Sequence, residues 1–376
     1  MPISLFAPVY DIEACIENVR DCLVKGWAGQ GYKTIEFEEA WKKYTGFPYA
    51  HLLCTGTAGL NMAVETLKEE YGWQDGEEVI STPLTFIATN NAILFSNLQV
   101  VFADVDNTMC LDPISVESRI TSKTKAVIFV GIAGNTGNYE DVVKLCRKYN
   151  LKLILDAAHM AGTRLNGIVP GKEADAVVYS YHVTKSLSTA DAGMLCFMDE
   201  QMDMIARQKS WNGIDKTHSP MAGEKHNKWE YDVRYLADAY NGNSIMASIA
   251  LAQLPHLDEE NAYRRRIAQW YREGFEKHSK KIRLVEVPKN CESAQWLFQI
   301  IVDDRNGLMN YLMQNGIGCG IHYPDNTIYS IYADSHGLCP NATYYSEHIV
   351  SLPMHTKLTK IDVQRVIDEV LNYTVR

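Results

Sequence analysis

Three short segments of the sequence carry residues whose types and positions could do chemistry. Lys185 stands among small and hydroxylated residues, between two apolar runs that are typical of strands. Asp156 follows the apolar run Leu151–Leu155, and a carboxylate at the end of a buried strand costs free energy unless it has a partner. Thr55-Gly56-Thr57 opens a helix-like segment, where free backbone N–H groups can bind an anion.

Each segment also has an ordinary explanation. Lys185 could be a solvated loop cation, Asp156 could be the N-cap of a following helix, and Thr55 could be an N-cap threonine without a ligand. Together, however, the three features match the needs of pyridoxal phosphate: a lysine for the Schiff base, a carboxylate that keeps the pyridine nitrogen protonated, and a helix end for the phosphate. Phe86 is a candidate for stacking on the ring.

The elements around these residues predict an α/β fold with a mostly parallel sheet and helices on both faces, because strand-like and helix-like segments alternate as far as about Leu254. In such sheets, ligands bind at the carboxyl ends of the strands. The clearest predicted strands are Val100–Ala103, Ala126–Val130 and Leu151–Leu155, and the clearest predicted helices are Ala58–Lys68 and Asp141–Tyr149. Ile12, Ile16, Val19 and Leu23 recur at helical spacing.

The regular alternation of strand-like and helix-like segments ends after Pro255. We therefore predict a large domain over residues 1–255 and a smaller α+β domain over residues 256–376. The second part begins with a long charged helix. Its predicted elements are the helix Glu259–Lys277, the strand Trp296–Val302, the helix Leu308–Gln314, the strand-like Cys319–Tyr323 and a final helix with a capping box from Thr359 to Asp362.

The composition limits the class of protein. The formal net charge is −10, which disfavours sequence-independent binding to nucleic acid. The nine cysteines are an odd number without a CxxC pair, so we expect neither a disulfide framework nor a metal site. The first residues lack the pattern of a signal peptide, and no apolar stretch approaches the roughly 20 residues of a membrane span. We therefore expect a soluble cytoplasmic protein.

Over nearly its whole length the chain resembles the DegT/DnrJ/EryC1/StrS-type nucleotide-sugar aminotransferases. Several short motifs carry this resemblance through their order and spacing. In chain order they are Trp27–Gly31 followed by Ile35–Glu38, Thr55–Leu60, Thr85–Thr89, Asp156–His159, Ser180–Lys185, Tyr240–Asn243, Gly320–Tyr323 and Ser351–Met354.

The resemblance implies a fold type I aminotransferase architecture, working as a homodimer with sites at the subunit interface. It implies that Lys185 is the Schiff-base lysine, that Asp156 is the partner of the pyridine nitrogen and that His159 faces the cofactor's phenolic oxygen. Phe86 would stack on the ring. The remaining contacts that it implies are Gly56, Thr57 and Ser180 to the phosphate, Asn241 to the phosphate of the neighbouring subunit, and His182, His322 and Tyr323 on the substrate side.

The implied reaction moves an amino group from L-glutamate to the ketone of a nucleotide-linked sugar, commonly C4 of a 4-keto-6-deoxy hexose and sometimes C3. Lys185 would shuttle the proton. Gly131 and Ala133 stand where the family often has a histidine and a tyrosine, which predicts a roomier pocket. A second histidine that usually follows His322-Tyr323 is also missing. These departures leave the sugar and its nucleotide open.

Three alternatives stay beside this interpretation. A sugar dehydratase of the same family would have a histidine in place of the lysine, so Lys185 argues against it. A non-catalytic, regulatory protein that binds pyridoxal phosphate would not need the intact set of Lys185, Asp156 and His322. An aminotransferase that acts on a non-nucleotide ketone, such as an aminocyclitol precursor, fits the sequence as well.

Overall fold

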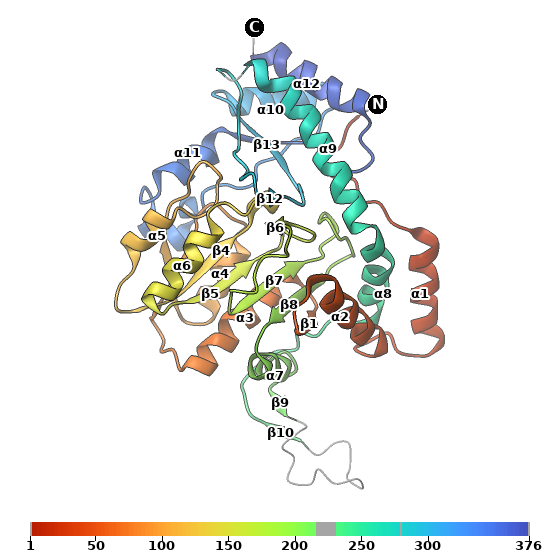
Figure 1. The fold of residues 1–376 in the computed structure, drawn as a ribbon, viewed down its shortest axis with the longest axis vertical. Coiled ribbons are helices and arrows are strands. Elements are labelled where there is room, and N and C mark those ends of the chain that lie inside the picture. Colours follow the sequence, from red (N-terminus) through yellow and green to blue (C-terminus); the bar gives the residue numbers. More distant parts are fainter. Residues whose placement is uncertain (1, 216–230, 279, 375–376) are drawn as a thin grey trace.

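The computed structural model describes residues 2–215, 231–278 and 280–374, and a seven-stranded sheet lies at its centre (Figure 1). The strand order is β1-β8-β7-β5-β4-β2-β3. In chain order these strands are β1 Tyr49–Leu53, β2 Glu78–Ser81, β3 Gln99–Phe102, β4 Thr124–Val130, β5 Lys152–Asp156, β7 Ala176–Ser180 and β8 Gly193–Phe197. Only β8 runs against its neighbours, β1 and β7, so the predicted mostly parallel sheet is confirmed.

Helices cover both faces of this sheet because its strands are apolar on both sides. In β4, Ala126 and Ile128 pack into one apolar cluster, whereas Val127 and Phe129 pack into the other, as the alternation of side chains along a strand requires. The first face is covered by α3 Gly56–Tyr71, α4 Ala88–Phe95 and α7 Glu200–Lys209. The second is covered by α2 Tyr32–Thr45, α5 Pro113–Arg119, α6 Tyr139–Tyr149 and α8 Ser244–Gln253.

A smaller layer with its own apolar core follows in the chain. It contains an antiparallel sheet of β11 Arg283–Leu284, β13 Phe298–Ile301 and β14 Ile349–Leu352, with the helices α9 Leu257–Phe275, α10 Arg305–Gln314 and α12 Lys360–Thr374. Ile3 also packs into this core, and Figure 1 shows the N-terminus beside α9 and α12. The division of the chain at residue 255 stays a prediction, and the first residues of the chain pack with the part that follows it.

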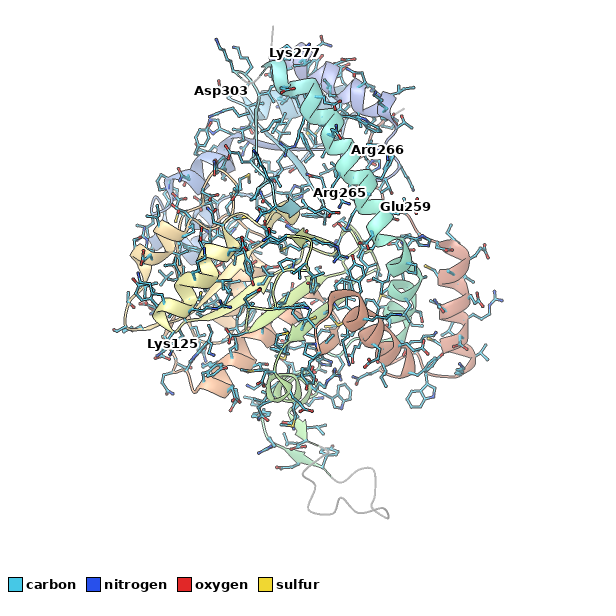
Figure 2. All side chains as sticks on the ribbon, in the orientation of Figure 1. Lys125, Glu259, Arg265, Arg266, Lys277 and Asp303 are labelled. Atoms are coloured by element: carbon cyan, nitrogen blue, oxygen red, sulfur yellow. The ribbon has the colours of Figure 1, made fainter. Side chains whose placement is uncertain are left out.

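The long charged helix that the sequence predicts is α9, which begins and ends two residues earlier than expected. Glu259 and Arg266 lie on its solvent side, and Arg265 pairs with Glu292 at 2.8 Å (Figure 2). The other described elements are α1 Ile12–Val24, α11 Pro340–His348, the short pairs β6 Arg164–Leu165 with β12 Cys291–Glu292 and β9 Ile214–Asp215 with β10 Asp232–Val233, and the 3₁₀ turns Ile132–Gly134, Leu254–His256, Glu276–His278, Asn326–Ile328 and Ser330–Ser335.

Two further predictions have different outcomes. The capping box is confirmed, because Thr359 and Asp362 each accept a hydrogen bond from the other's backbone amide. The predicted strand Cys319–Tyr323 is wrong: only Gly320 pairs, with Ser351, because this segment turns into the cavity described below. Among the residues that the structure describes, no helix is both long and apolar enough to cross a membrane.

The helix predicted from Ile12, Ile16, Val19 and Leu23 is present as α1, but three of these side chains face outward and Val19 is only partly buried. Ile12 is 63% exposed and Leu23 is 61% exposed, while α1 packs against α8 through other residues such as Cys22. The helical spacing therefore marks a surface of the chain rather than part of its core.

Candidate active site

A cavity of about 470 Å³ lies where β4, β5 and β7 end, between the large sheet and the smaller layer. It brings together most of the residues predicted to form the site, from segments far apart in the sequence. The predicted residues that line it are Gly56, Thr57, Phe86, Asp156, His159, Ser180, His182, Lys185, His322 and Tyr323. Asn241 is not among them.

Lys185 lies on the loop between β7 and β8, and its side chain enters the cavity. It is half-buried, and the part left open faces the cavity, so it is no solvated surface cation. Burial lowers the pKa of Lys185 to about 7, against an opposing effect of the Asp156 carboxylate. A large share of the amine is therefore neutral near pH 7, which is the form that attacks a carbonyl.

Asp156 is the last residue of β5 and is 4% exposed. Its Oδ2 accepts a hydrogen bond from Thr89 Oγ1 at 2.8 Å, and its Oδ1 accepts one from the amide of Ala158 at 3.1 Å. Residues 157–163 form turns rather than a helix, so Asp156 is not an N-cap. Burial raises the pKa of Asp156, while the two hydrogen bonds and the charge of Lys185 act in the opposite direction. The carboxylate is thus held in place beside a basic group.

His159 follows in the turn after β5 and is neutral. Its Nδ1 accepts a hydrogen bond from the amide of Ala133 at 3.2 Å, so in the neutral ring the proton sits on Nε2, 3.2 Å from the hydroxyl of Tyr323. Burial lowers the pKa of His159, and the charge of Lys185 lowers it further. The ring therefore offers an N–H donor at the cavity side.

The N-terminus of α3 opens into the same cavity. Thr55 is its N-cap: the side chain accepts from the amide of Ala58 at 2.9 Å, and the carbonyl accepts from the amide of Gly59 at 3.1 Å. The earlier amides of the first turn, those of Gly56 and Thr57, point out of the helix end. They can bind an anion together with the helix dipole, so the capping role of Thr55 and an anion site coexist.

Glycines let the strands approach this helix end closely. A Cβ at Gly56 would lie 2.8 Å from the Cβ of Ser180, and a Cβ at Gly193 would lie 2.4 Å from the carbonyl oxygen of Thr55. Any side chain at either position would separate α3 from β7 or β8. The hydroxyl of Ser180 accordingly lies beside the first-turn amides, as a phosphate site needs.

The donor set fits pyridoxal phosphate. Gly56, Thr57 and Ser180 can hold the phosphate, and the Asp156 carboxylate can hold a protonated pyridine nitrogen. The Lys185 amine can bond the aldehyde. Phe86 is 55% exposed at the cavity wall, with its ring centroid 5.9 Å from that of Tyr323, so a flat ring can lie against it.

The two histidines expected on the substrate side differ in how far they are buried. His322 Nδ1 lies 2.9 Å from the hydroxyl of Ser351, and burial lowers the pKa of His322 to about 4, so this ring is neutral. His182 is exposed, and its Nδ1 lies 3.1 Å from the hydroxyl of Thr184. The exposed His182 can therefore contact a ligand at the mouth of the cavity, whereas His322 forms part of the inner wall of the cavity.

The prediction of a roomier pocket at Gly131 is wrong. A Cβ at Gly131 would lie only 1.9 Å from Met160 Sδ, so the side chain of Met160 fills the space that the glycine leaves. Ala133 likewise lies against the site, where its amide donates to His159. Both residues support the wall of the cavity from behind.

Sequence reasoning missed three residues at this site. Thr89 was seen only as part of the motif Thr85–Thr89, although it bonds to Asp156. Phe6 and Trp296 both line the cavity, and their rings stack with centroids 5.4 Å apart. Trp296 was counted only as the first residue of the predicted strand Trp296–Val302, whereas the strand β13 begins at Phe298, and no local pattern marks Phe6.

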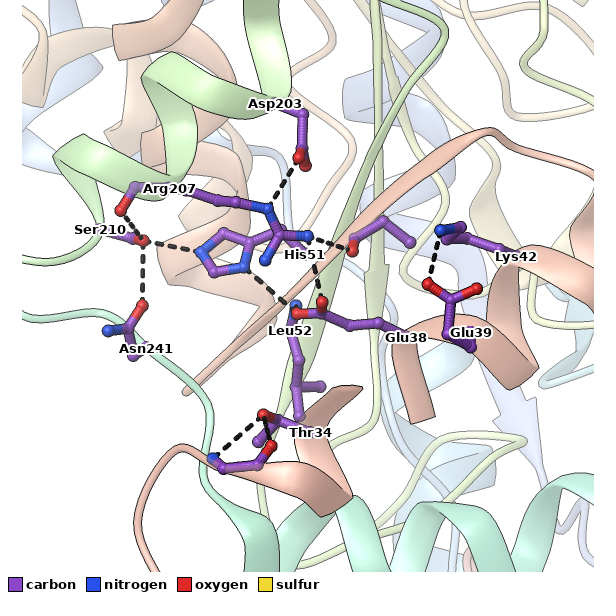
Figure 3. Close-up of polar contacts among 12 residues, drawn as sticks. Thr34, Glu38, Glu39, Lys42, His51, Leu52, Asp203, Arg207, Ser210 and Asn241 are labelled. Carbon is purple, nitrogen blue, oxygen red and sulfur yellow. Dashed lines mark hydrogen bonds and ion pairs between the residues drawn. The ribbon is translucent and has the colours of Figure 1, made fainter. Parts of the chain in front are cut away.

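Asn241 lies outside the cavity, in the loop before α8. Its Oδ1 accepts from Ser210 Oγ at 3.0 Å and its Nδ2 donates to Gln30 Oε1 at 3.0 Å. Behind Ser210, His51 lies at 2.7 Å and in turn contacts Glu38 at 3.3 Å (Figure 3). This order resembles that of a hydrolase triad, but Ser210 is fully buried, so the network supports the Asn241 loop instead.

Residues 10–371 match the DegT/DnrJ/EryC1/StrS aminotransferase family. The chain is 29% identical over 367 residues to the spore coat polysaccharide biosynthesis protein SpsC of Bacillus subtilis, covering 94% of this chain and 93% of that protein. It is 25% identical to Helicobacter pylori PseC, an aminotransferase involved in the biosynthesis of pseudoaminic acid, with a TM-score of 0.91 and 100% of each chain covered.

A third relative is the putative sugar aminotransferase Spr1654 of Streptococcus pneumoniae, with 26% identity, a TM-score of 0.88 and coverage of 100% of this chain and 98% of that one in its PLP-form. Its PMP-form is similar to this chain as well, with a TM-score of 0.89. The match over nearly the whole chain agrees with the lysine, carboxylate and helix end that meet in the cavity. The chain therefore belongs to the DegT/DnrJ/EryC1/StrS aminotransferase family, and it is a sugar aminotransferase that depends on pyridoxal phosphate.

Proposed function

We propose that the enzyme transfers the amino group of L-glutamate to the ketone of a nucleotide-linked sugar, most directly a 4-keto-6-deoxy hexose. The observation that carries this proposal is the convergence of Lys185, Asp156 and His159 on one cavity at the N-terminus of α3. The resemblance to nucleotide-sugar aminotransferases supplies the choice of donor and acceptor. The relatives SpsC and PseC, which serve the biosynthesis of a polysaccharide and of pseudoaminic acid, support a sugar as the acceptor.

Different residues of the chain have different roles in the proposed reaction. The cofactor, when bound, supplies the electron sink that makes the carbon next to the nitrogen acidic. Lys185 would bond the aldehyde through its neutral amine and, when its amine is free, would take up and return the proton of that carbon. Asp156 would hold the proton on the pyridine nitrogen by its charge. His159 donates its Nε2–H at the cavity side, and His322 and Tyr323 close the wall nearest the acceptor.

A homodimer belongs to the proposal. Several large apolar side chains of the N-terminal segment are exposed on this chain and need a cover: Ile12, Ile16, Leu23, Val24, Trp27 and Ile35. The turn that follows Trp27 contacts the Asn241 loop, because the carbonyl oxygens of Ala28 and Gly29 accept from the amide of Ser244. A second copy placed on this surface would bring Asn241 toward the partner's phosphate site.

The test is a panel of ketones offered to the purified enzyme together with L-glutamate. GDP-, UDP- and dTDP-linked 4-keto-6-deoxy hexoses and a free aminocyclitol ketone are compared by the release of 2-oxoglutarate. We expect release with at least one nucleotide sugar and none with Lys185→Ala. Release with the cyclitol ketone alone would replace the proposal by the non-nucleotide alternative, and a cofactor-loaded protein inert to the whole panel would favour the regulatory one.

A further inference from the structure

Trp296 closes the Lys185 side of the cavity from the smaller layer. It lies just before β13 and is 4% exposed. Its ring stacks with two others: the centroid of Phe6 lies 5.4 Å away at an interplanar angle of 11°, and that of His159 lies 3.9 Å away at 29°. Two stacked partners leave the indole little freedom to turn.

Two contacts join this indole to the segment that carries Lys185. The Nζ atom of Lys185 lies 3.7 Å from the centroid of the ring, over its face. The indole Nε1–H donates to the carbonyl oxygen of Thr184 at 2.6 Å. One side chain thus contacts both the head of the lysine and the backbone directly before it.

We propose that Trp296 is a further catalytic residue of this enzyme, which binds the protonated amine of Lys185 on the face of its indole and fixes the lysine through the carbonyl of Thr184. The proposal rests on the proposed function insofar as Lys185 is the reacting amine. Under this proposal, Trp296 of the smaller layer takes part in the proton transfer by Lys185, which lies on a loop of the large sheet.

The surroundings of the amine show what the indole face contributes. The ionisable groups that face Lys185 are the Asp156 carboxylate at the end of β5, His159 in the turn after it, and His322 and Tyr323 from the smaller layer, with His182 and Asp191 further along the cavity wall. Burial lowers the pKa values of His159 and His322, so neither ring competes as a cation. Burial raises the pKa of Tyr323, so its hydroxyl stays neutral.

An amine that both takes and returns a proton needs both of its forms within reach near neutral pH. Burial favours the neutral form, whereas the Asp156 carboxylate favours the charged one. The negative face of an indole also favours the charged form, because its quadrupole attracts a cation. Trp296 therefore keeps the protonated amine in the cavity, at the place where the proton is handed over.

The test measures the protonation of the Lys185 amine directly. The full-length protein is loaded with pyridoxamine phosphate, so that the cofactor is present and the lysine amine is free. Lys185 is then methylated with formaldehyde and cyanoborohydride across a pH series, and the modified peptide is measured by mass spectrometry. The midpoint of this profile reports the pKa of Lys185 without any need for turnover.

Trp296→Phe and Trp296→Leu form the matched pair, since both lose the indole N–H and only Phe keeps an aromatic face. The proposal predicts a midpoint in Trp296→Leu that lies about 0.4 to 1.5 pH units below that of Trp296→Phe. Equal midpoints, or a higher midpoint in Trp296→Leu, would overturn it. If Trp296→Leu does not fold, Trp296→Met takes its place in the comparison with Trp296→Phe: a lower midpoint supports the proposal, and an equal or higher one overturns it.

Trp270→Leu is the control, because Trp270 lies on α9 against Tyr263 and does not line the cavity. Its midpoint should equal that of the wild type. The hydrogen bond to Thr184 has its own readout: Trp296→Phe should lower kcat for the glutamate half-reaction several-fold with little change in KM. A loss confined to KM would overturn that part. Lack of turnover with every nucleotide sugar would leave these midpoints untouched, so failure of the proposed acceptor stays distinguishable.

Discussion

The hydroxyl of Thr89, on α4, donates to Asp156 Oδ2 across 2.8 Å, and the hydroxyl of Thr85 lies 3.0 Å from that of Thr89. Two threonines of one motif thus stand behind the carboxylate at the end of β5. A buried carboxylate loses the hydration that stabilises its charge, and each hydrogen bond to the charged form restores part of it. The motif orients Asp156 and opposes the rise in its pKa that burial causes.

Asp156→Asn should keep the fold but lower kcat of the glutamate half-reaction by about 10²–10³-fold, because an amide carries no charge to hold a proton on the pyridine nitrogen. Circular dichroism of both proteins checks the fold, and stopped-flow absorbance measures the half-reaction. Glu117→Gln, at an exposed position of α5, is the matched control for loss of a carboxylate and should behave as wild type. Activity near the wild-type level in Asp156→Asn would leave this carboxylate with a structural role only.

Thr89→Val should raise the pKa of Asp156, since it removes a donor to the charged form while nearly keeping the volume. A hydrogen bond to a charged group contributes about 1.5–3 kcal/mol, so the acid limb of the pH–rate profile should move upward by about 1 to 2 pH units. The profile of kcat/KM against pH measures this. An acid limb at the same pH as in the wild type would mean that protonation of Asp156 does not cause the fall in kcat/KM at low pH.

The sequence predicts those parts of the site that depend on one segment at a time. Lys185 between two strands, Asp156 after an apolar run and Gly56 at a helix start are local patterns, and the structure places all three in one cavity. Trp296 and Phe6 could not be predicted, because their stacking depends on how the N-terminal segment and the smaller layer pack against the large sheet.

The same distinction explains the wrong expectations. A glycine at position 131 suggests space, but the space belongs to Met160, which comes from the turn after another strand. The apolar spacing of Ile12 and Leu23 predicts a helix correctly, yet it cannot say whether the covering partner belongs to the same chain. Tertiary neighbours decide both cases.

The reaction of the cofactor-free protein with pyridoxal phosphate should depend on pH through Lys185. Burial lowers the pKa of this amine to about 7, and only the neutral form attacks an aldehyde. Below pH 7 the rate of covalent capture should fall about tenfold per pH unit, and above it the rate should level off. Stopped-flow absorbance in the visible region follows the capture. A rate that keeps rising to about pH 10 would show that the amine has the pKa of an ordinary lysine.

Mixing two inactive variants tests whether Asn241 serves the neighbouring subunit. A hydrogen bond from its amide to a charged phosphate contributes about 1.5–3 kcal/mol, so Asn241→Asp should weaken cofactor retention by at least about one to two decades. In a mixed dimer with Lys185→Ala, one site carries both lesions and the other carries neither. Random exchange should therefore restore about a quarter of the wild-type activity. If exchange is verified and the mixture stays inactive, Asn241 acts within its own subunit.

The most direct measurement of the central claim is reduction of the cofactor-loaded enzyme with borohydride, followed by peptide mapping. The account predicts that the visible absorption band disappears and that the cofactor remains fixed to Lys185, on the loop between β7 and β8. Lys185→Ala should bind pyridoxamine phosphate without any covalent label. Attachment to another lysine, or reduction that leaves every peptide unlabelled, would contradict the assignment on which the proposed chemistry depends.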